Sequence, residues 1–273
     1  MGRRQSLADI SYGFVIGAIA LLAVAIIVTP VIVVLIMSFT DHPSLNFPPT
    51  GFSLQWYRAL FDESQSRQIH RAAGNTLEVA AFSTLFGVLL GTLGALGLAR
   101  SRSNVARIAD SLFMSPLVLP AIAFGLAALM YFTLIGIRPS LGLLVAGHMI
   151  VTVPFVLRTT TASLSQLDPA LDASSQSLGA SWLYTLRRVT LPLIFPGIAA
   201  GAFLAFMSSV DNVAVSLFLS NARTDMLPIR MWGMMEATLD VRIAAISGIL
   251  IAAAFLLMLL MEWTVGLTRR MRD

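Results

Sequence analysis

The sequence predicts an all-α membrane protein with six transmembrane helices and both termini in the cytoplasm. Hydrophobic residues make up 57% of the 273 residues and charged residues only 12%, with a mean hydropathy of +0.82. Soluble globular domains, in contrast, contain about 25% charged residues. The apolar residues form continuous runs, which excludes the alternating pattern of a membrane β-barrel. Composition and pattern together therefore place the chain in a lipid bilayer as a set of helices.

Six apolar segments are long enough to span the bilayer, for which a helix needs roughly 20 residues at about 1.5 Å each. The third and fourth are separated only by the short turn 136–140. No linker divides the chain, so residues 1–273 are expected to form a single transmembrane domain. The expected spans are residues 14–38, 76–99, 110–135, 141–158, 196–219 and 242–263.

Glycine and proline predict local features of these spans. Gly87 and Gly91 form a GxxxG pair in the second span, which favours close packing against another helix. Pro116 and Pro120 in the third span and Pro154 in the fourth each remove a backbone hydrogen bond. These two spans are therefore expected to be kinked.

Two longer segments are expected outside the membrane, at 39–75 and 220–241. The first contains a Pro-Pro pair, which indicates an extended piece, followed by a short amphipathic helix at 53–61. Trp56 and Tyr57 in that helix suit the interface between lipid and water. An anchoring role is preferred there over a ligand site.

The orientation follows from the arginines, which account for all 18 basic residues. With the N-terminus in the cytoplasm, 11 arginines lie inside and seven outside. The bias is clearest beside the spans, around Arg100 to Arg107 and from Arg269 onward, as the positive-inside rule expects. The pI of about 10.3 thus reflects topology, and no nucleic-acid partner is expected. The first apolar run is too long for a cleaved signal peptide.

The chain carries no pattern typical of an enzyme. It has no cysteine and no lysine, which excludes thiolate chemistry and a P-loop. His42, His70 and His148 are scattered without metal-ligand spacing, and a hydrogen-bonded packing role is preferred for His148. No catalytic residue, metal site or cofactor of its own is therefore expected.

Asp211 and Asn212 are the polar residues that stand out inside the membrane, near the middle of the fifth apolar segment. A carboxylate at that depth costs roughly 2.5–3.5 kcal/mol even on insertion scales, so it normally faces a cavity or a partner. Two interpretations stay open. The pair lines a solute path, or Asp211 makes an interhelical hydrogen bond that holds two helices together.

A polar insert at 168–190 lies between the fourth and fifth spans. Asp168 and Pro169 are suited to the N-cap and first position of a helix over 170–178. Gly179 then interrupts, and Ser181 caps a second short helix over 182–189 that Pro192 is expected to end. A helix pair this short is marginal in water, so a docking partner is the natural stabiliser. Its candidate contact residues are Leu178, Ala180, Leu183 and Leu186.

This insert resembles the EAA loop of the permease subunits of bacterial ABC importers, which reads EAA, three residues, Gly and, farther on, Leu-Pro. Gly179 matches the glycine and Leu191-Pro192 the closing pair. The EAA triplet falls on Ala173-Ser174-Ser175, so the glutamate is missing, and Asp172 just before it is the candidate substitute. Further matches to the superfamily are Asn75-Thr76-Leu77, Ala99-Arg100 and Pro116-Leu117-Val118-Leu119-Pro120. Val210-Asp211-Asn212 and Leu227-Pro228-Ile229 look most like the spermidine/putrescine-type branch.

The resemblance implies a multi-pass permease subunit in the bacterial inner (plasma) membrane that forms half of the translocation pathway of an ATP-driven importer. It implies as partners a second permease subunit in a heterodimer, cytoplasmic ATP-binding subunits that bind the ATP, and an extracytoplasmic solute-binding protein. The implied substrate is a small organic cation such as a polyamine, with Asp211 and Asn212 on its path. The residues implied to couple to the ATPase are Asp172, Ala173, Ser174, Ser175, Leu178, Gly179 and Ala180.

An ion-coupled secondary transporter that uses Asp211 as its ion site is the alternative. Such transporters are typically built from internal repeats with interrupted helices at corresponding positions. No such repeat is visible in the sequence.

Overall fold

The structure is a computed structural model that describes residues 7–101 and 103–266. Within this part of the chain the regular structure is helical, apart from one isolated bridge between Thr40 and Phe52. Five of these helices are long and apolar enough to cross a membrane, or six if a bent pair counts as one span. The helical class is therefore confirmed, and the predicted six spans agree with the structure when the bent pair is counted as one span. Arg3, Arg4, Arg102, Arg269, Arg270 and Arg272, on which the expected topology partly depends, lie outside the described residues.

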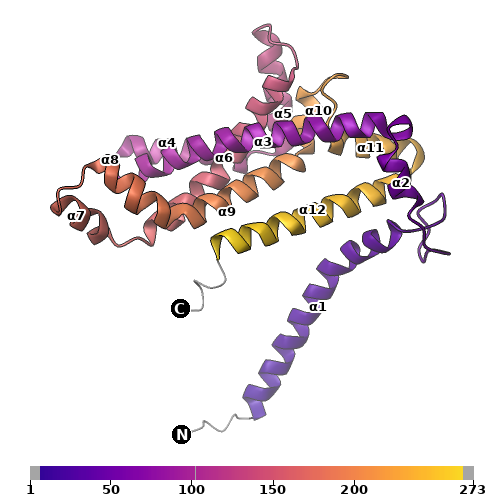
Figure 1. Cartoon of the computed structure of the whole chain (residues 1–273), viewed down its shortest axis with the longest axis horizontal. Helices are drawn as coiled ribbons and strands as arrows, with labels where there is room; N and C mark the ends of the chain where they lie inside the picture. The colour runs from indigo at the N-terminus through magenta and orange to yellow at the C-terminus, as the bar shows by residue number, and fades with distance from the viewer. Residues whose placement is uncertain (1–6, 102, 267–273) are drawn as a thin grey trace. The chain divides into compact units, whose positions relative to one another are not determined.

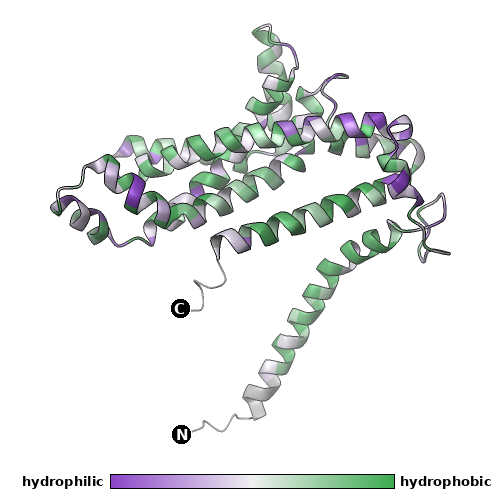
Figure 2. Ribbon diagram, in the orientation of Figure 1, coloured by the Kyte–Doolittle hydropathy of each residue, from purple (hydrophilic) through white to green (hydrophobic). Residues whose placement is uncertain are grey.

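The helices take up most of the described chain (Figure 1). The long ones are apolar along most of their length (Figure 2). In chain order they are α1 (Leu7–Met37), α2 (Gln55–Phe61), α3 (Glu63–Ala99), α4 (Asn104–Val118), α5 (Ala121–Leu134), α6 (Leu141–Ser165), α7 (Pro169–Ser177), α8 (Trp182–Thr185), the π-helical turn η1 (Leu186–Thr190), α9 (Leu191–Val210), α10 (Val213–Leu219), α11 (Leu227–Thr238) and α12 (Arg242–Val265).

Several helices extend beyond the spans expected from the sequence. α3 begins at Glu63 rather than at residue 76, and α6 ends at Ser165 rather than at 158. Hydropathy identifies the part of a helix that can lie in lipid, whereas polar turns can extend the helix beyond it. In α3 this extension is kinked at Ser66, whose φ of −129° and ψ of 17° are not helical. The extra turns are therefore polar extensions of the expected spans.

The chain divides into two compact units, residues 1–66 with 234–252, and residues 67–233 with 253–273. In the first unit, α2 is tied to the end of α1 by its two aromatic residues. Trp56 Nε1 donates a hydrogen bond to the carbonyl oxygen of Thr40 at 2.8 Å, and the Tyr57 hydroxyl donates to Ser38 Oγ at 2.8 Å. A Cβ at Gly248 of α12 would lie 2.6 Å from the Tyr57 hydroxyl. A glycine there therefore lets α12 approach α2 closely.

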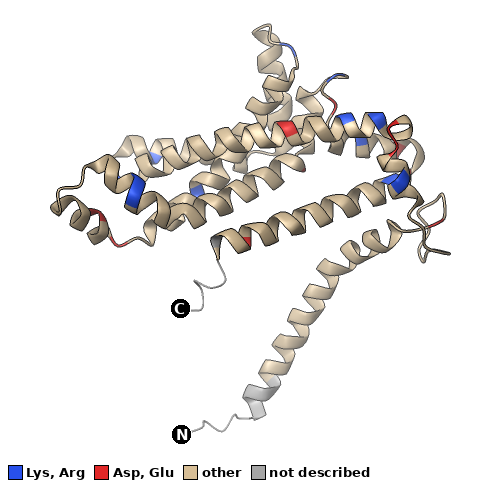
Figure 3. Ribbon diagram, in the orientation of Figure 1, with Lys and Arg blue, Asp and Glu red and all other residues tan. Residues whose placement is uncertain are grey.

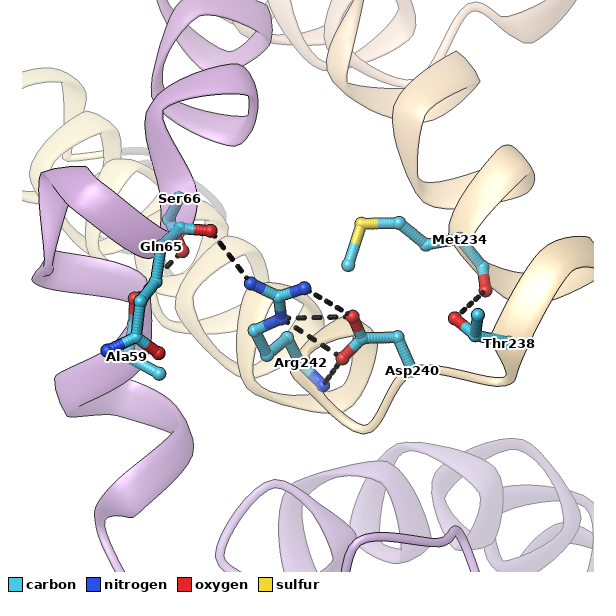
Figure 4. A network of polar contacts seen from close by, with 7 residues as sticks. All are labelled: Ala59, Gln65, Ser66, Met234, Thr238, Asp240 and Arg242. Carbon is cyan, nitrogen blue, oxygen red and sulfur yellow. Dashed lines mark hydrogen bonds and ion pairs between the residues drawn. The ribbon is translucent and has the colours of Figure 1, made fainter.

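The start of α12 is held by an arginine clamp, shown in Figure 4. The Arg242 guanidinium donates hydrogen bonds to both carboxylate oxygens of Asp240, at 2.6 to 3.1 Å, and to the carbonyl oxygen of Gln65 at 3.0 Å. Burial opposes ionisation of Asp240. The hydrogen bonds and the charge of Arg242 outweigh that effect, so the pKa of Asp240 lies below its ordinary value.

α1 stands out because most of its side chains from Tyr12 onward are exposed in the isolated chain. It carries no charged residue between Tyr12 and Met37 (Figure 3). An apolar helix of this length has no favourable place in water. Its exposed surface must therefore be covered by lipid or by another protein.

In the second unit, α6 packs between α3 and α9, and the three helices run side by side in Figure 1. A Cβ at Gly91 of α3 would lie 2.7 Å from Val156 Cβ, and one at Gly201 of α9 would lie 2.7 Å from the Val156 Cα. Gly87 lies one turn from Gly91 and faces Thr152. The predicted role of the GxxxG pair in close helix packing is confirmed.

The third span differs from the single kinked helix that was expected over 110–135. It consists of α4 and α5, which meet at an angle of 106°. Pro120 disfavours the α-helical region for the preceding residue, and Leu119 accordingly has φ −72° and ψ 140°. The helix breaks completely before Pro120, whereas Pro116 lies inside α4.

Candidate functional site

The fifth apolar segment is broken at its polar pair, and the expectation of one continuous helix over 196–219 is wrong. α9 ends with Asp211 as its C-cap, and α10 begins with Asn212 as its N-cap. The Asn212 Oδ1 accepts a hydrogen bond from the backbone N–H of Val215 at 2.9 Å. An asparagine side chain offers the backbone this alternative to the helical pattern. Asp211 therefore lies at a gap between two helices rather than within one.

The Asp211 side chain is exposed in the isolated chain. Its carboxylate makes no hydrogen bond or ion pair with any other residue in the part of the chain that the structure describes. The C-terminal end of a helix carries partial negative charge, so a carboxylate there is unfavourable unless a cation lies nearby. The break thus combines a carboxylate with the negative end of α9, and both favour a positively charged ligand.

A buried polar cluster lies beside the break. His148 of α6 is fully buried. Its ring nitrogens lie 2.8 Å from Ser209 Oγ on α9 and 3.2 Å from Ser216 Oγ on α10. The sequence predicted a hydrogen-bonded packing role for His148, and this is confirmed. It did not identify the two serines, although their positions on either side of Asp211 and Asn212 were a usable signal.

The insert at 168–190 forms the predicted pair of short capped helices. The Asp168 side chain accepts from the backbone N–H of Ala170 at 2.8 Å, and Ser181 accepts from the N–H of Tyr184 at 3.3 Å. Gly179 between the helices has φ +85°, a conformation that glycine adopts without strain. The predicted caps and the predicted break are therefore confirmed.

Pro192 does not end the second helix, and Pro196 does not open the fifth span, contrary to expectation. The chain stays helical from Trp182 through η1 into α9 and up to Val210. A proline inside an α-helix lacks the N–H donor and clashes with the carbonyl four residues earlier. The π-turn directly before Pro192 widens the helix there, which relieves that clash. The loop is therefore continuous with the membrane helix that ends at Asp211.

Asp172 holds α7 to the rest of the second unit. Its carboxylate lies 3.3 Å from Arg100 Nη2 at the end of α3 and accepts a hydrogen bond from the Thr190 hydroxyl at 3.0 Å. The same guanidinium lies over the ring of Trp182, 5.1 Å from its centroid. In the sequence analysis, Arg100 was matched to the family only through the Ala99-Arg100 pair that closes the second span. Its contacts with both loop helices make it part of the loop.

The predicted coupling residues fall into two groups. Asp172 and Ser175 make contacts inside the chain, since the Ser175 hydroxyl lies 2.9 Å from that of Thr185. Leu178 is 89% exposed, which leaves it free to contact a partner. Ala173, Ser174 and Gly179 are exposed as well, and Ala180 is partly exposed.

Among the described residues, no group of three or more acidic, histidine or cysteine side chains is placed to hold a metal ion.

The broken span and the loop are joined by one long helical segment, residues 182–210. Long apolar helices, a carboxylate at the break in an apolar span and an exposed, capped loop together point to the class of multi-span transport proteins.

Comparison with known proteins identifies the family. The chain belongs to the family of binding-protein-dependent transport system inner membrane components, whose model matches residues 83–272. It is thus a permease of the ABC importer family, located in the inner membrane. The members of this family are transport components, and the comparisons indicate no enzymatic activity.

The curated relatives match along most of both chains. The spermidine/putrescine transport system permease protein PotC of Escherichia coli strain K12 is 29% identical over 231 residues, 84% of this chain and 86% of its own. PotC of Haemophilus influenzae is 27% identical over 250 residues, 91% of this chain and 95% of its own. The putrescine permease PotI of Escherichia coli strain K12 is 26% identical over 242 residues, 86% and 85% of the two chains.

Solved structures show the same fold. A permease chain of a bacterial ABC transporter that imports the acidic polysaccharide alginate matches with a TM-score of 0.69 and 19% identity, over 97% of this chain and 99% of that one. The MetNI methionine ABC transporter in an inward-facing form matches with a TM-score of 0.63 and 17% identity, over 75% of this chain and 98% of that one.

Proposed function

We propose that this chain forms half of the translocation path of an ATP-driven importer for small organic cations of the polyamine class. The observation that carries the proposal is the similarity to permeases for spermidine and putrescine over most of both chains. Asp211 at the broken span supports it physically. A carboxylate beside the C-terminal end of α9 favours a protonated amine and disfavours an anion.

The proposed partners are a second, different permease subunit, cytoplasmic ATP-binding subunits and an extracytoplasmic solute-binding protein. The solved relatives with the same fold include an alginate transporter in complex with a periplasmic protein. This chain has no lysine and therefore no P-loop of its own, so the partner subunits would bind the ATP. All 273 residues would act as one permease domain.

The insert at 168–190 would be the site that transmits movements of the ATP-binding subunit. Leu178 and Leu183 are exposed, at 89% and 64%, and offer apolar contact area outside the lipid. Asp172 is bonded to Arg100 and Thr190. Docking in this chain would thus depend on apolar contacts of the loop rather than on an ion pair from Asp172.

The most direct test is transport by the assembled complex. The tagged chain is purified in mild detergent with its partners, the partners are identified by mass spectrometry, and the complex is reconstituted in vesicles with its solute-binding protein. ATP-dependent uptake of labelled putrescine and spermidine is expected, together with little uptake of a neutral sugar or an anionic amino acid. Uptake of neutral or anionic solutes at equal rates would overturn the substrate assignment.

The same vesicles separate the proposal from an ion-coupled transporter. Membership in the family already speaks against that alternative. Omitting ATP, or replacing it by a nonhydrolysable analogue, is expected to abolish uptake even under an imposed ion gradient. Uptake that an ion gradient drives without ATP would favour the ion-coupled transporter, the alternative in which Asp211 is the ion site.

A further inference from the structure

The buried cluster around His148 connects both sides of the α9–α10 break. Ser209, which bonds Nδ1 at 2.8 Å, lies in the last turn of α9, and Ser216, which bonds Nε2 at 3.2 Å, lies in the first turns of α10. Both serines are buried, with 1% and 0% of their surface exposed. Asp211 and Asn212 are the only residues between the two helices. One imidazole thus bridges the two helix ends that flank the polar pair.

The bond that the Ser83 hydroxyl donates determines the donors and acceptors in the rest of the cluster. The Ser83 hydroxyl of α3 donates to the carbonyl oxygen of Ala80 at 3.3 Å, and lies 3.1 Å from Ser209 Oγ. Ser209 therefore donates to Ser83 and accepts from Nδ1–H of His148. A neutral imidazole has one donor and one acceptor nitrogen, so Nε2 accepts from the Ser216 hydroxyl. The network is complete only when His148 reaches both serines.

Close packing fixes α10 from two further directions. A Cβ at Gly147, next to His148 on α6, would lie 2.6 Å from Leu219 Cδ1 and 2.8 Å from Val215 Cγ1. A Cβ at Gly125 of α5 would lie 2.7 Å from the carbonyl oxygen of Ala214. α10 therefore sits in direct contact with the backbones of α5 and α6. Its position is determined by this packing together with the hydrogen bonds of His148.

We propose that His148 is the positioning residue of the break. By holding Ser209 and Ser216 to one ring, it sets the distance between α9 and α10 and thereby the place of the Asp211 carboxylate in the solute path. That Asp211 faces the solute path rests on the function proposed above. That His148 sets the distance between α9 and α10 does not depend on that function. Loss of either bond would leave a buried hydroxyl or ring nitrogen without a partner, which costs free energy, and would let α10 shift.

The geometry is tested by spin labelling, because the natural chain contains no cysteine. Leu204 of α9 and Leu217 of α10, 43% and 53% exposed, are replaced by cysteine and labelled with a nitroxide in the assembled complex. Ser216→Ala and His148→Asn, which is too short to reach Ser216, are expected to broaden the distance distribution between the labels. Ser165→Ala is the control, because among the described residues the Ser165 hydroxyl bonds to the carbonyl oxygen of Ala162 within the same helix. Distributions identical to that of the unsubstituted pair would overturn the proposal.

A double-mutant cycle tests the functional part. Ser216→Ala is expected to lower putrescine uptake at saturating solute roughly two- to tenfold, the effect of about one buried hydrogen bond, while the yield of the complex is retained. In an Asp211→Asn background the same change should have no further effect, because it acts through that carboxylate. Additive losses would show a general structural role and overturn the positioning claim. Unchanged uptake in Asp211→Asn alone would overturn the proposed role of Asp211, and the spin labels would still decide the geometry.

Discussion

Asp211 is the residue that gives the proposed path its charge. Asp211→Asn removes the carboxylate with almost no change of volume. We expect putrescine uptake to fall roughly threefold to thirtyfold, since a solvated charge pair at about 4 Å is worth about 1–4 kcal/mol and part of that is lost to water. Initial uptake rates in vesicles measure the effect, and Glu236→Gln on α11 is the matched control. Loss of the complex with normal uptake by surviving assemblies would indicate a structural residue instead.

Asp240 gives a pH-dependent prediction at the same scale. Its pKa is lower in the folded protein than in the unfolded chain, since the hydrogen bonds from Arg242 outweigh its burial. A depressed pKa contributes stability above the unfolded value near 3.8, and that contribution is lost as the pH falls through the folded pKa. Asp240→Asn should therefore lower the melting temperature in detergent at pH 7. The gap to the wild type should close as the pH falls below about 3.8. A gap that is constant down to pH 3 would argue against the ion pair as its cause.

Single-residue chemistry was largely predictable from the sequence. The caps Asp168 and Ser181 and the break at Gly179 follow from local hydrogen bonding and backbone conformation, which a short stretch of sequence determines. The bond between Arg100 and Asp172 joins residues 72 positions apart. The partners of His148 are 61 and 68 positions away. Such pairs depend on the packing of α3, α6 and α9, which one sequence does not reveal.

At the scale of elements, the effects of the prolines and of the Asp211-Asn212 pair on the helices were the hardest to predict from the sequence. Pro120 breaks a span completely, whereas Pro192 and Pro196 lie within one long helical segment. A π-turn precedes Pro192, but Pro116, Pro154 and Pro196 lie inside α-helices without one. The presence of a proline therefore does not decide whether a span breaks, and its tertiary packing has to be known. The break at Asp211 was missed because the apolar run continues through it, and hydropathy does not register a cap such as Asn212.

Gly179 offers a clean test of the loop, because a Cβ there would meet no other atom within 4 Å. Gly179→Val therefore acts only through the backbone, where a positive φ costs a β-branched residue about 1–2 kcal/mol. We expect insertion in the membrane to be retained and the affinity for the ATP-binding subunit to fall roughly five- to thirtyfold, with loss of transport. Binding of purified ATP-binding subunit to the chain in nanodiscs measures this.

Gly97→Val on α3 is the matched control for the loop variant. A Cβ at Gly97 also meets nothing within 4 Å, and its φ is ordinary. It should leave the affinity unchanged. Wild-type affinity and transport in Gly179→Val would mean that the loop conformation does not transmit the movement.

At the scale of the whole molecule, the permease fold follows from composition and span pattern, and the family and the solved relatives agree with it. Sequence alone could not divide the chain into the two compact units. It also could not show that α1 has its apolar surface exposed, since both depend on long-range contacts. A helix such as α1 is understandable only as part of an assembly in lipid, which agrees with the proposed second permease subunit.

The orientation of the chain in the membrane can also be tested, because hydrogen bonds and an ion pair mark the two ends of the second unit. Asn221 donates to the carbonyl of Pro139 at 2.7 Å and Asn75 to that of Asp225 at 2.9 Å, so the segments expected outside meet at one end of the second unit. Arg100 meets Asp172 at the other end of α3 and α6. We propose that the Arg100 end of the second unit faces the cytoplasm, as the positive-inside rule favours. That both termini are cytoplasmic stays a prediction from the sequence.

Single cysteines in the natural cysteine-free chain can decide this. In intact cells, Thr224→Cys should react with a membrane-impermeant maleimide, and Gln176→Cys should react only after the membrane is opened. Reporter fusions at Ser103 and Gln176 should score cytoplasmic, and those at Ser64 and Thr224 external. The reverse pattern at all sites would place the loop 168–190 outside the cell, where no ATP-binding subunit could reach it, and would overturn the proposed coupling mechanism altogether.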